Sequence, residues 1–163
     1  MPIRTRHGSR MMDTPQELLD DVGPAEFVEM GTLVADLAGR HVLEGAPFGT
    51  RVIVDVTDMR ITGPRLNARM VGTAAADWGA RGADGTFQLD VRCTLETDDG
   101  ALVLIQYNGR VDFSDTAHPG PVYCTPRFET GDPRYAWLNK VQAVMKGRSN
   151  GRSLIAYRMY EIR

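Results

Sequence analysis

The sequence predicts an all-β protein: a closed antiparallel up-and-down β-barrel of about eight strands with a short N-terminal helix. Runs rich in Val, Leu, Ile, Thr and aromatic residues alternate with clusters of Gly, Pro and Asp. The runs follow one another without crossover helices, which favours antiparallel pairing. Asp-Gly and Asn-Gly pairs supply tight turns between neighbouring runs. Such a barrel has room for one small ligand, and a two-sheet sandwich is the alternative.

Residues 1–26 are predicted to form an N-terminal arm and one short helix. Met1 to Met12 carries scattered charges and no hydrophobic periodicity, so this stretch is expected to be a loose arm. Thr14 and Glu17 form a capping box around Pro15, which suits the first helical position, and Gly23-Pro24 ends the segment. The two-turn helix has an apolar edge that is expected to lie on a larger body: Leu18, Leu19 and Val22.

Residues 27–163 are predicted to form a single barrel domain. Hairpin turns are expected at Asp99-Gly100 and Asn150-Gly151, because such pairs adopt the positive φ angles of tight antiparallel turns. Asp84-Gly85 is a similar turn, within a loop expected from Gly79 to Gly85. The predicted strands are Phe27 to Leu37, Thr50 to Thr57, Leu66 to Val71, Thr86 to Glu96, Ala101 to Val111, Val122 to Phe128, Ala136 to Met145 and Ser153 to Ile162.

Composition narrows the possible functions. A chain of 163 residues is long enough for one ordinary hydrophobic core. The 19 basic and 21 acidic residues leave no excess positive charge for a phosphate backbone, so no nucleic-acid partner is expected. No run approaches the ~18 apolar residues of a membrane-spanning helix, and no secretory signal is visible. We therefore expect a cytoplasmic protein without a membrane partner.

The cysteines and histidines form no metal-binding pattern. Cys93 and Cys124 have no CxxC spacing and are expected to be free, reduced thiols. The histidines His7, His41 and His118 share no ligand spacing with them. The sequence also has no Ser nucleophile elbow, phosphate-cradling glycine loop or dinucleotide fingerprint. Neither a metal nor another cofactor is expected.

Motifs spread over Phe27 to Arg163 match a known family. They are GPRL (Gly63 to Leu66), ADW (Ala76 to Trp78), LDVR (Leu89 to Arg92), TDDGAL (Thr97 to Leu102), PRFETGDPRYAWLN (Pro126 to Asn139) and YRMYE (Tyr157 to Glu161). With these motifs the chain resembles the DUF3237 or UPF0311 family of uncharacterised proteins. The resemblance implies a compact antiparallel β-barrel, in agreement with the strand pattern. It implies no reaction, because a shared fold does not give a shared chemistry.

One predicted strand has two clearly different faces. From Leu89 to Leu95 the apolar residues share one parity, while Asp90, Arg92 and Thr94 share the other. The polar face either points to solvent or lines a ligand site. Asp90 and Arg92 lie two residues apart, so an ion pair between them is the structural alternative to ligand binding.

Carboxylates, arginines and aromatic residues gather at predicted strand ends, which favours acid–base catalysis without a cofactor. Glu129 and Asp77 are the candidate acid–base residues, and Arg127 is the candidate that stabilises a developing oxyanion. A carboxylate desolvated beside an aromatic ring has its pKa raised toward the working range. The structural alternatives are an Arg127–Glu129 salt bridge and a turn aspartate at Asp77. The candidate ligand-binding residues are Trp78, Asp90, Arg92, Tyr107, Tyr135, Trp137 and Asn139.

The segment from Thr125 to Asn139 is predicted to form the lip of the binding site. It is expected to contain a strand end, a turn at Gly131-Asp132-Pro133 and the start of the next strand. Because side chains alternate along a strand, four of them are expected to point together into the barrel mouth: Arg127, Glu129, Trp137 and Asn139. The structural alternative for Asn139 is that its side chain ties down a strand end.

Two classes of function remain open. We favour an enzyme, a lyase, isomerase or cyclase, that acts on a small aromatic or carbonyl-bearing molecule in the barrel. The alternative is a non-catalytic barrel that binds or carries a small molecule. A homo-oligomer, first a dimer, is expected, because strands that are apolar on both faces need cover and an open sheet edge invites pairing. Tyr157 and Tyr160 fall on opposite faces of the last strand, so at most one of them lines a pocket.

Overall fold

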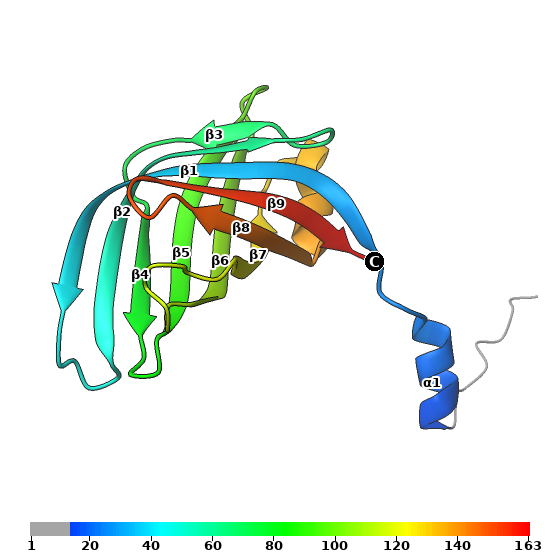
Figure 1. The fold of residues 1–163 in the computed structure, drawn as a ribbon. Helices are drawn as coiled ribbons and strands as arrows, with labels where there is room; N and C mark the ends of the chain where they lie inside the picture. Colours follow the sequence, from blue (N-terminus) through cyan, green and yellow to red (C-terminus); the bar gives the residue numbers. More distant parts are fainter. Residues whose placement is uncertain (1–13) are drawn as a thin grey trace, which may run out of the picture.

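The computed structural model describes residues 14–163, and its main body is one antiparallel sheet closed into a β-barrel (Figure 1). The strands are β1 (Phe27–Leu43), β2 (Thr50–Thr62), β3 (Ala68–Met70), β4 (Ala76–Arg81), β5 (Thr86–Thr97), β6 (Leu102–Asp112), β7 (Val122–Glu129), β8 (Ala143–Ser149) and β9 (Leu154–Ile162). Two helices accompany them: α1 (Pro15–Val22) before the barrel and the 3₁₀ helix η1 (Pro133–Lys140) between β7 and β8. The predicted fold class is confirmed.

The ring closes because the first strand pairs with both the second and the last. The nine-stranded sheet has the order β1-β9-β8-β7-β6-β5-β3-β2-β4, and pairing of β1 with β2 joins the two sides. β3 and β4 both lie between β2 and β5, so the ring has eight positions. Strands adjacent in sequence are adjacent in the ring, which is the up-and-down meander that short turns predict.

Alternate residues of each strand fill the interior. Residues paired directly across two antiparallel strands project to the same side. The pairing therefore identifies, strand by strand, which alternate residues point into the barrel. Val91 of β5 faces Asp77 of β4 and Tyr107 of β6, and Tyr107 faces Pro126 of β7. All of these are buried in the core. The interior is therefore packed with side chains along most of its length.

The strand predicted from Ala136 to Met145 is wrong in its first half. Residues 133–140 form η1, and β8 begins only at Ala143. Asp132 is the N-cap, because its side chain accepts a hydrogen bond from the Arg134 N–H, and Pro133 occupies a first-turn position. The predicted turn at Gly131-Asp132-Pro133 is thus a helix start. Leu138 of this helix is fully buried against the barrel core.

β4 is a strand where the sequence predicted a loop from Gly79. It pairs with β2 on one side and β5 on the other, and it runs to Arg81. Its small residues Ala76, Gly79 and Ala80 conceal it, because β-propensity resides in branched and aromatic side chains. Without β4, one end of the barrel wall between β2 and β5 is missing.

The three predicted turns are confirmed, and each places glycine at a positive φ. Gly100 has φ +87°, Gly151 has φ +74° and Gly85 has φ +86°. At the β8–β9 turn the Asn150 side chain also accepts backbone hydrogen bonds from residues 152–154. Side-chain caps and glycine conformations therefore set these turns locally.

The helix α1 has the predicted capping box, since the Thr14 hydroxyl accepts from the Glu17 N–H at 3.2 Å. Its apolar edge does not lie on a larger body: the exposed fractions of Leu18, Leu19 and Val22 are 53, 66 and 79 %. Figure 1 shows the helix projecting beyond the point where the chain leaves the barrel. The expected loose arm, Met1 to Met12, lies outside the described residues. Neither helix among residues 14–163 has the length and apolarity to cross a membrane.

Candidate functional site

A hollow of about 730 Å³ lies at one end of the barrel. It is bounded by the β1–β2 hairpin, the turn between β4 and β5, and the segment that follows β6. η1 occupies the opposite end, where Arg134 binds Asp99 in the turn between β5 and β6. Figure 1 shows η1 at one end of the barrel and the β1–β2 hairpin at the other, and the hollow lies at the hairpin end. The charged residues of the hollow are Arg40, Glu44, Arg81 and Asp84, and its apolar side chains include Val42, Val52 and Phe113.

Two arginines reach the hollow from inward-facing positions of the barrel wall. Arg81 pairs with Thr50, and Arg40 pairs with Val54, in both cases on β2. A bulge just before Arg40 brings its side chain to the inner face, and Gly39 supplies the necessary φ of +34°. Without this bulge, Arg40 has the outward parity of the strand that precedes it.

Asp77 lies on β4 farther from the open end of the barrel than Arg81. Its cross-strand partner Val54 is also the partner of Arg40, so the three residues share one level of three neighbouring strands. A strand spacing of about 4.8 Å puts the backbones of Arg40 and Asp77 roughly 10 Å apart. The Asp77 side chain faces the core, and the residue is only 8 % exposed.

The surroundings of Asp77 raise the pKa of its carboxyl to about 6, chiefly because burial disfavours the charged form. A hydrogen bond of 2.9 Å from the Asp90 N–H to Oδ1 opposes this shift in the pKa, and the nearby Asp90 charge adds to it. Near neutral pH the group is therefore close to its pKa and suited to give or take a proton. Asp77 thus lies within β4 with its carboxyl buried, and its role as an acid–base residue stays a prediction.

Two tyrosines share the barrel interior with Asp77. The rings of Tyr107 and Tyr157 pack edge-to-face with centroids 6.1 Å apart. Burial raises the pKa of both hydroxyls well above the usual value, and the Asp77 charge adds to the effect on each pKa. Both tyrosines therefore remain protonated hydrogen-bond donors. Within residues 14–163 the Tyr157 hydroxyl is buried without a hydrogen bond of good geometry, and the Cys124 thiol beside it affects its pKa. Tyr160 has the opposite parity on β9.

A pair of phenylalanines lies between the hollow and Asp77. Gly79 is the inward-facing residue between Arg81 and Asp77 on β4, and a Cβ at Gly79 would overlap the ring of Phe87. Phe87 in turn packs edge-to-face against Phe113 with centroids 5.9 Å apart, and Phe113 lines the hollow. A molecule that passes from the hollow to Asp77 must displace these rings.

Arg127 and Glu129 do not point into the barrel mouth, and that prediction is wrong. The buried residues of β7 are of the other parity and include Phe128, whereas Arg127 and Glu129 are exposed on the outer face. The apolar face of β7 points into the barrel, because burying Phe128 stabilises the fold and burying two charges does not. Their predicted salt bridge is not formed in the described part of the chain.

Three further candidates lie on the outer surface of the barrel. Trp78 is 41 % exposed and has the opposite parity to Asp77. Asp90 and Arg92 face outward from β5 and form an ion pair of 3.8 Å. The structural alternative for this pair is confirmed, and the structure brings neither residue to the hollow.

The candidates on η1 lie at the plugged end, away from the hollow. Tyr135 and Trp137 pack against the core, and the Arg65 guanidinium lies 3.8 Å above the Trp137 ring. Asn139 holds Thr130, just after β7, by accepting from its N–H and donating to its carbonyl, both at 2.9 Å. The alternative that Asn139 ties down a strand end is confirmed.

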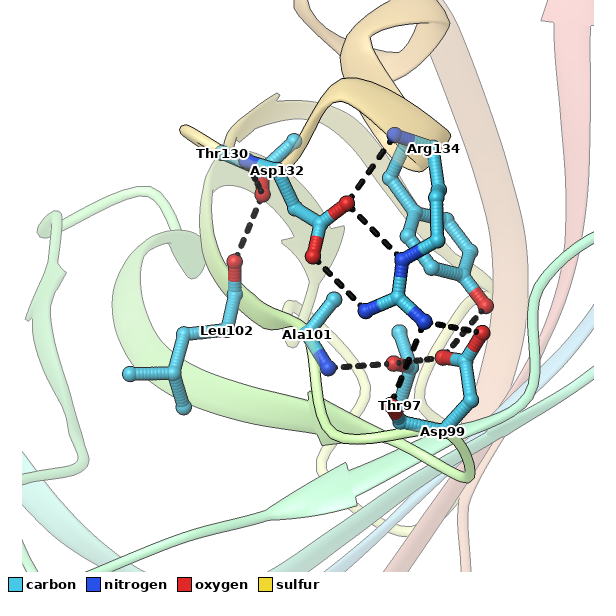
Figure 2. A network of polar contacts seen from close by, with 8 residues as sticks. Thr97, Asp99, Ala101, Leu102, Thr130, Asp132 and Arg134 are labelled. Atoms are coloured by element: carbon cyan, nitrogen blue, oxygen red, sulfur yellow. Dashed lines mark hydrogen bonds and ion pairs between the residues drawn. The ribbon is translucent and has the colours of Figure 1, made fainter.

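Figure 2 shows the polar network that fixes the start of η1 to the turn between β5 and β6. The Arg134 guanidinium binds Asp132 Oδ2 at 2.7 Å and Asp99 Oδ2 at 2.9 Å. Hydrogen bonds from Arg134 lower the pKa of Asp132 to about 2. Thr97 donates to Asp99 Oδ1 at 2.6 Å, which helps to lower the pKa of Asp99. The polar part of the segment from Thr125 to Asn139 thus belongs to a plug.

The sequence-based candidates omitted Arg40 and Arg81 and left Tyr157 undecided. Arg81 could have been found as a basic residue on the face of a strand whose other residues point inward, but that strand was not predicted. For Arg40 the bulge at Gly39 reverses the parity, and the simple alternation rule fails there. Only the inward face of β9 distinguishes Tyr157 from Tyr160.

The two thiols and the carboxylates form no evident metal site. Cys93 and Cys124 are free and buried, as predicted, and burial raises the pKa of the thiols to about 11 and about 12. Among the described residues, no three His, Cys, Asp or Glu side chains gather in a way that would hold a metal ion. The polar groups of the barrel interior named above are the Asp77 carboxyl, the hydroxyls of Tyr107 and Tyr157, and the two thiols.

These features define a small β-barrel that is plugged at one end, hollow at the other, and equipped with a buried titratable carboxylate beneath the hollow. The chain belongs to the family described as "Protein of unknown function (DUF3237)", whose model matches residues 26–162. The helix α1 precedes the matched region.

Curated relatives match parts of the chain. A hydroalkoxylation enzyme of Penicillium herquei is 31 % identical over 103 residues, which cover 63 % of this chain and 61 % of that protein. A UPF0311 protein of Rhodopseudomonas palustris strain TIE-1 is 26 % identical over 102 residues, which cover 55 % of this chain and 66 % of that protein. The matched part therefore spans about two thirds or less of each relative's length.

Solved structures share the fold. A "beta-barrel like" protein of Acinetobacter baumannii AYE has a TM-score of 0.78 at 28 % identity, covering 86 % of this chain and 98 % of that chain. An enzyme from Penicillium herquei has a TM-score of 0.62 at 23 % identity, covering 86 % of this chain and 94 % of that chain. At the latter identity the likeness concerns the fold alone.

Proposed function

We propose that this protein is a cofactor-independent enzyme that transfers protons on a small organic molecule bound at the open end of the barrel. One observation carries the proposal: Asp77 is a buried carboxyl with its pKa raised to about 6, on the wall below the hollow. A general acid or base works best when its pKa lies near the working pH. The 31 % identical relative that is named a hydroalkoxylation enzyme supports the same class of chemistry.

In this proposal Asp77 is the general base or acid, and Tyr107 and Tyr157 are hydrogen-bond donors to an oxygen that gains negative charge. A donor that stays neutral near pH 7 and is held in a dry site stabilises such an oxygen strongly. The buried Tyr157 hydroxyl supports this role, because the Cys124 thiol beside it is only a weak hydrogen-bond acceptor. A bound substrate oxygen is a stronger acceptor for the same hydroxyl.

Hydroalkoxylation illustrates the reaction type. An O–H group adds across a carbon–carbon double bond, so the O–H bond and the π bond break while a C–O and a C–H bond form. The atoms balance without an oxidant or a reductant, and an intramolecular case closes a ring. Asp77 as carboxylate accepts the hydroxyl proton, or as carboxylic acid protonates the alkene carbon. The lyase, isomerase and cyclase reactions proposed from the sequence need the same proton transfers.

The test is turnover of a panel of alkenyl phenols in deuterium oxide, followed by mass spectrometry. The wild type is expected to give a product isomeric with the substrate in which one hydrogen is replaced by a carbon-bound deuterium. Asp77→Asn should lower turnover by about 100-fold or more, because the amide keeps the acceptor for the Asp90 N–H but does not exchange protons. The surface variant Glu96→Gln, on the outer face of β5, is the matched control and should retain turnover.

Two results would count against the proposal. Loss of turnover in Glu129→Gln with normal turnover in Asp77→Asn would transfer the catalytic role to the outer face of β7. Retention of an unaltered molecule, with no product from any member of the panel, would favour the carrier alternative. Circular dichroism of each variant separates a catalytic effect from loss of fold.

A further inference from the structure

We infer that the hollow at the open end is a binding site for the anionic group of an aromatic organic acid, held by Arg40 and Arg81. This inference deepens the proposed function by naming a substrate class for the same site. It rests on the two guanidinium groups and the apolar lining, which are independent of any role of Asp77.

The two arginines are not neutralised by partners within the described residues. Arg81 donates one hydrogen bond of 3.4 Å to the carbonyl of Phe113, and neither arginine takes part in an ion pair. Other arginines do pair with carboxylates, such as Arg134 with Asp132 at 2.7 Å. Two inward-facing guanidinium groups at one hollow, with free donors, match the fork geometry that recognises a carboxylate or phenolate.

The two carboxylates that line the hollow, Asp84 and Glu44, do not occupy the position of an anion bound by Arg40 and Arg81. Asp84 already accepts from the Thr86 N–H at 2.9 Å and from the Thr86 hydroxyl at 3.0 Å, which lowers its pKa. Glu44 lies beyond the end of β1, in the exposed tip of the hairpin. It forms no ion pair with either arginine in the part of the chain described. Glu44 therefore weakens the attraction for an anion without blocking the arginines.

The apolar side chains that line the hollow favour a ligand whose uncharged part is aromatic. Val42, Val52 and Phe113 present apolar surface beside the arginines, and Phe87 packs edge-to-face against Phe113. Aromatic rings stack favourably on such surfaces. Arg40 and Asp77 share one level of the wall at a backbone spacing of roughly 10 Å. Once the rings of Phe87 and Phe113 are displaced, a flat aromatic acid of one or two fused rings spans this interval between its anionic group and the carbon that faces Asp77.

The experiment is a calorimetric titration of wild-type protein with 1-naphthoate and with its neutral isostere 1-naphthamide. We expect 1-naphthoate to bind about 10-fold more tightly than the amide, the effect of one or two charge-assisted hydrogen bonds. Arg40→Gln and Arg81→Gln should each weaken naphthoate binding by about 10-fold and leave amide binding unchanged. Glu44→Gln should strengthen naphthoate binding. Arg110→Gln, on the outer face of β6, is the matched control and should bind as the wild type.

Equal affinities for acid and amide, no binding of either, or unchanged naphthoate binding in both arginine variants would overturn the inference. Inorganic phosphate is the second probe: binding as tight as that of naphthoate would show a general anion site and would remove the aromatic specificity. Normal naphthoate binding with full turnover in Asp77→Asn would refute only the proposed function. Loss of turnover in Asp77→Asn without acid preference would refute only this inference.

Discussion

Asp77 illustrates how one residue acquires its chemistry from its neighbours. Its sequence neighbour Trp78 and its backbone donor Asp90 are both partly exposed, yet the Asp77 side chain is buried. The alternation of β4 places it inside, and the closed ring removes its water. The raised pKa is a consequence of the fold and has a cost in stability that depends on pH.

The first prediction concerns this cost. The pKa of Asp77 rises from 3.8 to about 6 on folding, so the folded state binds the proton more tightly than the unfolded state. The contribution of Asp77 to stability is fully present below pH 3.8 and is lost as the pH rises to about 6. Asp77→Asn lacks this titration. The free energy of unfolding of the wild type, relative to Asp77→Asn, should fall by about 3 kcal/mol across this range.

Urea unfolding of both proteins at several pH values between 4 and 8 measures the difference, with groups common to both cancelling. Asp98→Asn, an exposed residue of the β5–β6 turn, is the control and should run parallel to the wild type. A constant difference between wild type and Asp77→Asn at all pH values would show that Asp77 is not desolvated.

At the scale of elements, η1 decides which end of the barrel is open. Its sequence, rich in charged and aromatic residues, has the composition of a binding-site lip. In the structure Tyr135 and Trp137 pack against the barrel core, while the exposed Arg134 binds Asp99 in the turn between β5 and β6 (Figure 2). The helix packs Leu138 into the core end, which leaves the hollow at the other end as the entrance.

The second prediction tests the attachment of η1. Asn139→Ala removes two hydrogen bonds to the backbone of Thr130, each of 2.9 Å, and should lower the free energy of unfolding by about 1–2 kcal/mol. Asn139→Asp keeps the acceptor and loses the donor, so its effect should be smaller. Thermal unfolding measures both. Because Asn139 lies at the plugged end, neither variant should change naphthoate binding, and a change would show that ligands reach that end.

At the scale of the whole molecule, closure of the ring changes the argument for an oligomer. Because β1 pairs with both β2 and β9, the ring is closed, and in the described part of the chain residues 38–43 of β1 keep one unpaired side. Strand addition is thereby confined to short stretches of edge and does not by itself explain a dimer. The exposed apolar edge of α1 remains, with Leu19 66 % and Val22 79 % exposed. An isolated helix of about eight residues is marginally stable in water, which favours cover from another surface.

We therefore propose that the chain forms a homodimer in which a second copy covers α1. Light scattering should give twice the monomer mass of 18.0 kDa. A double substitution Leu19→Glu and Val22→Glu should shift the mass toward the monomer, whereas Gln16→Glu on the same helix should not. A wild-type monomer at working concentration would refute the dimer.

Sequence reasoning reached the fold and part of the site. Asp77 and Tyr107 were named, and both lie in the interior. Arg127 and Glu129 were named because they lie in a polar and aromatic segment, but their parity points outward. The error has one cause: alternation separates the two faces of a strand and does not say which face is inside.

The sequence by itself determined most of the strands, their order in an up-and-down meander, the glycine turns and the capping box of α1. These depend on contacts between residues close in the chain, whose propensities are local. Tertiary structure alone decided the inward parity, the bulge that brings Arg40 to the hollow, the hidden strand β4 and the plugged end. Those features depend on the total apolar surface that the closed ring buries, and every strand contributes to this total. Closure of the ring buries Asp77, which raises the pKa of its carboxyl. The same closure leaves Glu129 on the outer surface, because Phe128 occupies the inner face of β7.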